Sequence, residues 1–272
     1  MRTLNFSFRR LWMLMRWDFG VNGKVYFLRI SGLFIAFLLV LVCNSYRWDG
    51  GVVLRDGHTY EQCLFYAQYS VSRELVGSCL MIFFLAAIFQ ASCFMEGMSK
   101  KDGRICIFTL PVSNLEKFVY RAFLVTVCFI LAGWAVFALA DLVRYLILPL
   151  MDVNLEVQRV WLTDDFLRTS CVWLWGSDSF PPRSASWIIP WGYLIHVLFV
   201  LGRCHWRRMA GWRILAGVLL IMWGIPKLLL HFVPDNVTAI YAPAIGLKMV
   251  LWTLVILCWL LAYRSFCRSQ VV

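Results

Sequence analysis

Charged residues are scarce in this chain of 272 residues. They make up 15% of it, while hydrophobic residues make up 61% and the mean hydropathy is +0.73. A typical soluble domain carries about 25% charged residues. The composition therefore excludes a disordered chain, a basic nucleic-acid-binding domain and an ordinary cytosolic enzyme. The question that it leaves is how many times the chain crosses a lipid bilayer.

Catalytic and metal-binding motifs are also missing from the sequence. The segment Gly20-Val-Asn-Gly23-Lys24 is too short for a phosphate-binding loop, and there is no H-E-x-x-H and no G-x-S-x-G. The 10 cysteines form no C-x-x-C pair, and the 4 histidines lie far apart at His58, His196, His205 and His231. We therefore expect no enzyme activity in the chain by itself, no cofactor, no metal and no disulfide scaffold.

Long apolar runs dominate what is present, and they predict an all-α, polytopic membrane protein. A span needs roughly 20 apolar residues. We expect six spans in a single transmembrane domain that covers residues 1–272, at residues 26–43, 75–95, 118–148, 187–202, 212–233 and 244–263. No cleavable signal peptide is apparent in residues 1–24, so we expect insertion to begin with the first span.

Basic residues choose the orientation of these spans. Most of the 26 lysines and arginines fall at the two termini and in the loops after the second and fourth spans. Because lysine and arginine accumulate on the cytoplasmic side of membrane proteins, both termini are expected in the cytoplasm. The loops at 44–74 and 149–186 then lie outside, where we expect short helices over the membrane.

Residues 6–19 have the pattern of an amphipathic helix that lies in the membrane interface. An apolar stripe recurs at helical spacing, and three arginines lie off it. The stripe is Phe8, Leu11, Trp12, Met15 and Phe19, and the arginines are Arg9, Arg10 and Arg16. The alternative is a plain cytosolic lead-in to the first span.

Asp141 and Arg144 are charged residues in the outer half of the third expected span. Their spacing of three places them on one helical face. Charges at membrane depth are costly unless they are paired or face a polar cavity. The two could line a translocation path or lock a conformational state; alternatively, they form an ion pair near the outer headgroups that ends the helix.

The loop at 96–117 has the most specific pattern. Ser113 and Glu116 have the spacing of a capping box, so a helix is expected to start at Asn114, after Pro111. The loop also carries basic residues that should form an exposed surface: Lys100, Lys101, Arg104 and Lys117.

The stretch Leu110-Pro-Val-Ser-Asn-Leu-Glu-Lys-Phe118, followed by Arg121, resembles the LPAS-x-x-EKF-x-x-R stretch of bacterial ABC-2-type permeases, with Val112 in place of alanine. These are the membrane subunits of ATP-binding-cassette transporters. The opening residues 6–12, with Arg16 and Asp18, are similar to the basic-aromatic lead-in of that family. Residues 140–144 and 202–213 are weaker matches.

The resemblance implies an exporter of the bacterial inner membrane in which this chain forms the path. A separate ATPase subunit would bind ATP and Mg, and a second permease, identical or not, would complete the unit. The loop would dock on the ATPase, with Leu110 and Leu115 as anchors beside Ser113 and Asn114, and the N-terminal helix would flank it. The alternatives are a six-span secondary transporter or channel, a membrane-embedded enzyme, and a sensory or assembly protein.

Overall fold

The computed structural model describes residues 6–47, 59–95, 112–151, 155–158, 160–167, 185–205 and 241–268. Among these residues all regular structure is helical and no strand occurs. Within the described ranges, four helices are long and apolar enough to cross a membrane: Phe8–Tyr46, Tyr60–Ser92, Asn114–Leu150 and Met249–Arg268. The all-helical class and the presence of several such helices are thereby confirmed.

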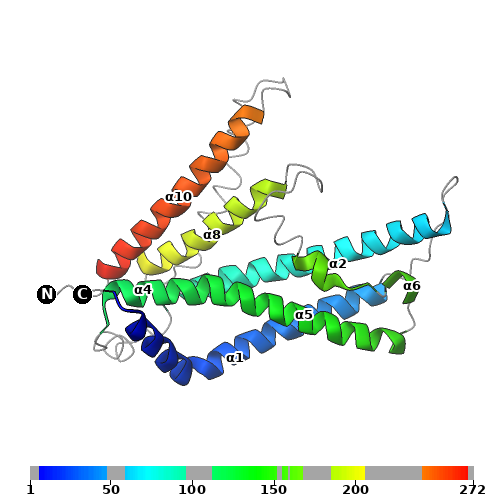
Figure 1. The fold of residues 1–272 in the computed structure, drawn as a ribbon, viewed down its shortest axis with the longest axis horizontal. Helices are drawn as coiled ribbons and strands as arrows, with labels where there is room; N and C mark the ends of the chain where they lie inside the picture. Colours follow the sequence, from blue (N-terminus) through cyan, green and yellow to red (C-terminus); the bar gives the residue numbers. More distant parts are fainter. Residues whose placement is uncertain are drawn as a thin grey trace. The chain divides into compact units, whose positions relative to one another are not determined.

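The helices follow the chain in the order drawn in Figure 1. They are α1 (Phe8–Arg47), α2 (Tyr60–Ser92), α4 (Asn114–Phe123), α5 (Phe129–Ile147), α6 (Leu155–Gln158), α8 (Ala185–His205) and α10 (Tyr241–Arg268). A π-helical turn, η1 (Leu124–Cys128), joins α4 to α5 without a break, and the 3-10 turn η2 (Leu148–Leu150) follows α5. Residues 162–167 form one further short helix.

The expected spans are covered to different degrees. Those at 26–43 and 118–148 lie within candidate membrane helices, and those at 75–95 and 244–263 overlap them. The span at 187–202 lies within α8, which is not among the four candidates. The span at 212–233 falls outside the described residues. The count of six therefore stays a prediction.

Two helices are longer than the elements expected for them. Helix α1 runs without interruption from the amphipathic stretch into the first span. Asp18 accepts hydrogen bonds from Asn22 Nδ2 (2.7 Å) and Tyr26 Oη (2.6 Å), which bridge the place where we expected a change of element. Helix α2 starts at Tyr60 because Thr59 and Gln62 exchange hydrogen bonds of the capping-box type, with Thr59 N to Gln62 Oε1 at 3.1 Å.

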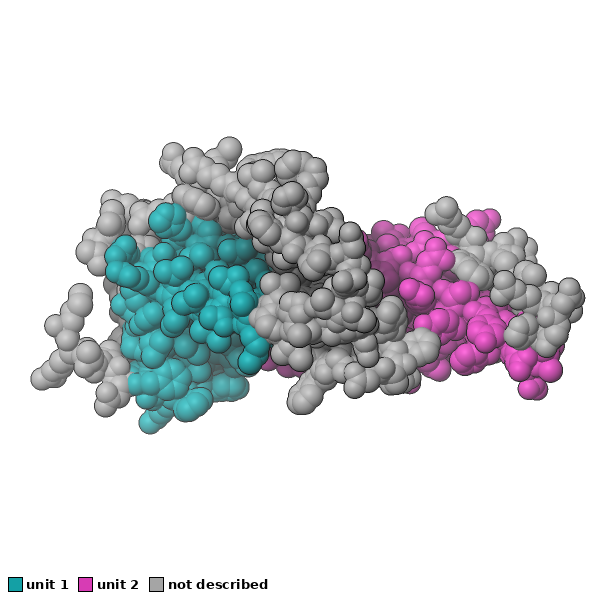
Figure 2. Space-filling view, turned by 90° about the horizontal axis from the view of Figure 1, so that it is seen from above, with its two compact units in different colours: residues 1–17, 87–126, 176–272 teal, residues 18–86, 127–175 magenta. Residues whose placement is uncertain are grey.

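The chain divides into two compact units, coloured separately in Figure 2. Unit 1 comprises Met1–Trp17, Ala87–Thr126 and Gly176–Val272, and unit 2 comprises Asp18–Ala86 and Val127–Trp175. In unit 2 the core forms around Phe37, Phe137 and Phe166, the last two stacked at 3.9 Å between ring centroids. In unit 1, Leu194 and Val197 of α8 pack on Leu251 and Val255 of α10.

Candidate functional site

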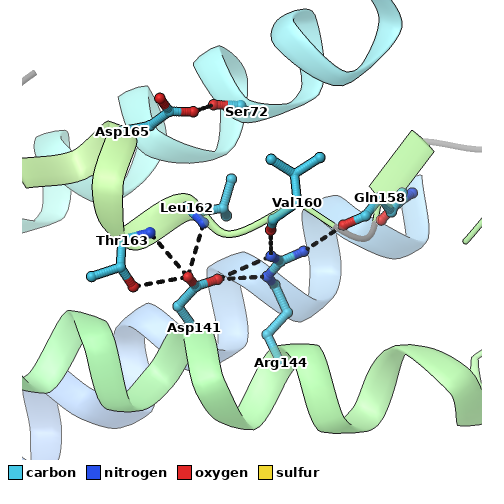
Figure 3. Close-up of polar contacts among 8 residues, drawn as sticks. All are labelled: Ser72, Asp141, Arg144, Gln158, Val160, Leu162, Thr163 and Asp165. Atoms are coloured by element: carbon cyan, nitrogen blue, oxygen red, sulfur yellow. Dashed lines mark hydrogen bonds and ion pairs between the residues drawn. The ribbon is translucent and has the colours of Figure 1, made fainter. Parts of the chain in front are cut away.

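Asp141 and Arg144 form an ion pair on α5, one helical turn apart. Asp141 is fully buried and Arg144 is 1% exposed. Arg144 donates from Nη2 to Asp141 Oδ1 at 2.9 Å and from Nε to the same oxygen at 3.1 Å. Figure 3 shows both side chains reaching from α5 toward residues 158–163. Their remaining hydrogen-bonding capacity is directed at that segment.

The second oxygen of Asp141 caps the short helix at 162–167. Oδ2 accepts from Leu162 N (2.9 Å), Thr163 N (3.0 Å) and Thr163 Oγ1 (2.9 Å). The first amides of a helix have no partner within the helix, and a carboxylate also complements the positive end of the helix dipole. Asp141 therefore serves as an N-cap supplied from outside the short helix.

Arg144 holds the carbonyl groups on the other side of this turn. Nη1 donates to Gln158 O at 3.1 Å, at the end of α6, and Nη2 donates to Val160 O at 2.5 Å. Terminal helix carbonyls carry partial negative charge, which a guanidinium neutralises. The pair thus clamps two short helices, and we call residues 155–158 and 160–167 the clasp segment.

The clasp segment is also bonded to α1 and α2. Gln158 Nε2 donates to Ser45 O at 2.6 Å, and Ser72 Oγ donates to Asp165 Oδ2 (Figure 3). Glu156 accepts from Tyr60 Oη through its carboxylate at 2.5 Å and from Gln68 through its backbone carbonyl at 2.8 Å. One short segment therefore ties together α1, α2 and α5 within unit 2.

A second polar cluster lies at the start of α4, in unit 1. Ser113 Oγ accepts from Glu116 N at 3.2 Å, and Ser113 N donates to Glu116 Oε2 at 2.8 Å, which completes a capping box. Glu116 Oε1 also accepts from Ser7 N (2.6 Å) and from Arg10 Nη2 (2.9 Å). Ser7 directly precedes α1, so one fully buried carboxylate bonds the leading residues of two helices.

Phe118 and Arg121 fasten the same stretch to other helices of unit 1. The Phe118 ring contacts Phe94, and on α10 it contacts Trp259, Tyr263 and Phe266, with centroid distances of 5.3–5.8 Å. Arg121 Nη1 donates to Phe94 O at 2.7 Å, just beyond the end of α2. Residues 113–121 therefore connect the start of α4 to α1, to α10 and to the residues that follow α2.

The other expected site residues of the loop divide into three groups. Asn114 and Leu115 are exposed, Leu115 by 44%. Lys117 is only 4% exposed, which corrects the expectation that it adds to an exposed basic surface. Lys117 belongs to the buried part of α4, together with Glu116, Phe118 and Tyr120. Lys100, Lys101, Arg104, Leu110 and Pro111 lie outside the described residues.

The N-terminal stripe is exposed in part. Phe8, Trp12 and Phe19 are exposed beside Arg9 and Arg16, whereas Leu11 and Met15 are half-buried. Arg10 turns away from this face to Glu116. An exposed aromatic stripe flanked by arginines has the composition of a helix in the membrane interface, although the helix continues unbroken into the first span.

No group of three or more potential metal ligands occurs among the described residues. His196 is buried on α8, with Nδ1 3.2 Å from Ala87 O and its ring stacked near Tyr193, as in a packing histidine. Comparisons with protein-family models, curated proteins and solved structures gave no match to this chain.

Proposed function

We propose that this chain is the permease subunit of an ATP-binding-cassette exporter of the bacterial inner membrane, with both termini in the cytoplasm. It would pair with a second permease and with a separate ATPase subunit that binds ATP and Mg. The four apolar helices, the excess of basic residues on one predicted side and the stretch from Leu110 to Arg121 support this proposal.

The observation that carries the proposal is the construction of the first turn of α4. Its N-terminus is fixed by the capping box, and the side chains of Glu116, Lys117 and Phe118 are buried, while Asn114 and Leu115 are exposed. A rigid helix start that presents an apolar side chain is suited to insertion into a pocket of a soluble partner. Movement of that partner would then act directly on the long helical run from Asn114 to Leu150.

In this proposal the ion pair on α5 holds one conformational state. ATP binding would close the ATPase pair and shift the permeases between inward- and outward-facing populations. Both charges of the pair are bonded to the clasp segment. Such a pair is better suited to holding one end of the moving helices in place than to lining a polar substrate path. Breaking it should therefore disturb the balance of states and not the choice of substrate.

The test is purification in mild detergent, with mass spectrometry and ATP turnover. The wild type should bring down, in stoichiometric amount, a protein that carries a phosphate-binding loop. Leu115→Asp places a charge in the buried contact and should release the ATPase while the permease stays in the membrane. Leu150→Asp is the matched control, because it makes the same change at an 86% exposed leucine at the other end of the same helical run and should leave the complex intact.

Retention of the ATPase and normal ATP turnover by the Leu115→Asp variant would exclude this segment as the coupling element. If the wild-type chain brings down no such ATPase, the proposal of a transporter subunit fails as a whole.

A further inference from the structure

Glu116 has more partners than a helix cap requires. A capping box uses one carboxylate oxygen on one backbone amide. Here Oε2 fulfils that task at Ser113 N (2.8 Å), while Oε1 is directed at Ser7 N and Arg10, 109 and 106 residues away in sequence. The Glu116 side chain is fully buried, whereas Arg10 keeps 28% of its side chain exposed.

The electrostatics of this cluster favour a permanent carboxylate. The N-termini of α1 and α4 each carry partial positive charge, and Arg10 adds a full one. Hydrogen bonds to charged groups are roughly twice as strong as neutral ones. Both oxygens of Glu116 accept, whereas a glutamine has one accepting oxygen and a donating NH2 group, so it would lose part of the hydrogen bonding as well as the charge. The acid is therefore needed for the link to α1 and not only for the cap of α4.

We propose that Glu116 and Arg10 are positioning residues that join the first turn of α1 to the first turn of α4, and that residues 6–17 thereby form part of the coupling element. This inference rests on the proposed function, because coupling requires the ATPase. The N-terminal helix then acts as more than a membrane anchor: displacement of α4 by a partner moves the start of α1 with it.

Because both helices are continuous, a displacement of their first turns is passed on to the helical runs that follow them. Helix α1 is uninterrupted from Phe8 to Arg47, and α4 continues through η1 into α5. A tie between their first turns therefore applies one input to two of the four candidate membrane helices. If the N-terminal stretch of α1 only rested on lipid, a displacement of α4 could reach α1 through packing contacts alone.

The experiment has two measurements. The first is amide hydrogen exchange of the purified permease over residues 6–14. Glu116→Ala should speed exchange in this stretch by about tenfold or more, because it removes all the bonds to Ser7 and Arg10. Arg10→Met should speed it by about threefold, because it removes only the ion pair. Lys24→Met, which removes an exposed positive charge farther along α1, is the control and should leave it unchanged.

The second measurement is ATP turnover of the assembled complex. Arg10→Met should keep its ATPase bound through Leu115 yet lower permease-stimulated turnover by about fivefold, and the Arg10→Met, Glu116→Gln double variant should be little worse than Glu116→Gln alone. Unchanged exchange over residues 6–14 in Glu116→Ala would overturn the link, and unchanged turnover in Arg10→Met would overturn its role in coupling.

Failure of the proposed function has a different signature. A wild-type chain without an ATPase would still give the exchange pattern above, since the purified permease alone reports the link.

Discussion

Neutralising Asp141 should loosen the clasp segment and destabilise unit 2. In the Asp141→Asn variant, Arg144 remains within α5 with no counter-charge, although an amide oxygen can still accept from Leu162 N or Thr163 N. Removing one partner of a buried pair costs about 3–5 kcal/mol. Arg144→Met should cost a similar amount, because it strands the Asp141 carboxylate in the same site.

The double variant should lose much less than the sum of the two. No uncompensated charge remains, and the main residual loss is that of the donors to Gln158 O and Val160 O. Each unsatisfied buried carbonyl costs about 1–3 kcal/mol. We therefore expect the double variant to lose about 2–6 kcal/mol, against about 6–10 kcal/mol for additive effects.

The assay is thermal unfolding in detergent, in which the fraction of protein that stays monodisperse is measured after heating. Amide exchange over residues 155–167 is the local readout. Thr163→Val provides a milder variant in case the single charge changes prevent folding. It removes one of the three donors to Asp141 Oδ2 and should cost about 1 kcal/mol. Additive losses in the double variant would refute the reasoning, because they would show that the two charges do not depend on each other.

Two further predictions test packing and orientation. A Cβ added at Gly133 would run into the edge of the Phe83 ring, which is stacked on Phe129, whereas nothing lies within 4 Å of one added at Gly77. Gly133→Ala should therefore lower the thermal midpoint, because overpacking costs about 1–3 kcal/mol of unfolding free energy. Gly77→Ala should raise the midpoint, because alanine within a helix is more favourable than glycine by up to about 1 kcal/mol. A shift of the same sign in both variants would contradict this packing. For orientation, single cysteines should be placed at the exposed positions Ser70 and Asn114 of a chain otherwise free of cysteine. An impermeant thiol reagent should label the former and not the latter in intact cells, and the reverse result would invert the topology.

Features that depend on local sequence were predictable. The capping box at Ser113 and Glu116 and the shared face of Asp141 and Arg144 follow from spacings of three residues. The early start of α2 had a local signal as well, since Thr59 and Gln62 have the capping-box spacing. The expected span nevertheless began at residue 75, because it was defined by apolar content. Residues 60–74 are too polar for a span, yet they are helical.

Features that depend on distant contacts were not predictable. No local pattern links Glu116 to Ser7 or Arg10, and none shows that Lys117 lies on the buried side of α4. Apart from Thr163 Oγ1, the partners of this pair in residues 158–163 are backbone groups, and backbone groups carry no sequence signature. Pattern analysis can therefore find a charged pair but not the segment that neutralises it.

The short sequence distance between the ion pair and its partners has a consequence for biosynthesis. Arg144 is separated from Gln158 by 14 residues and Asp141 from Thr163 by 22. Contacts of such low sequence separation form quickly, because little chain entropy is lost in closing the loop. In the proposed topology, the clasp segment can therefore reach Asp141 and Arg144 as soon as it has emerged on the far side of the bilayer. The charges of the third span would then be neutralised before α8 and α10 have been synthesised.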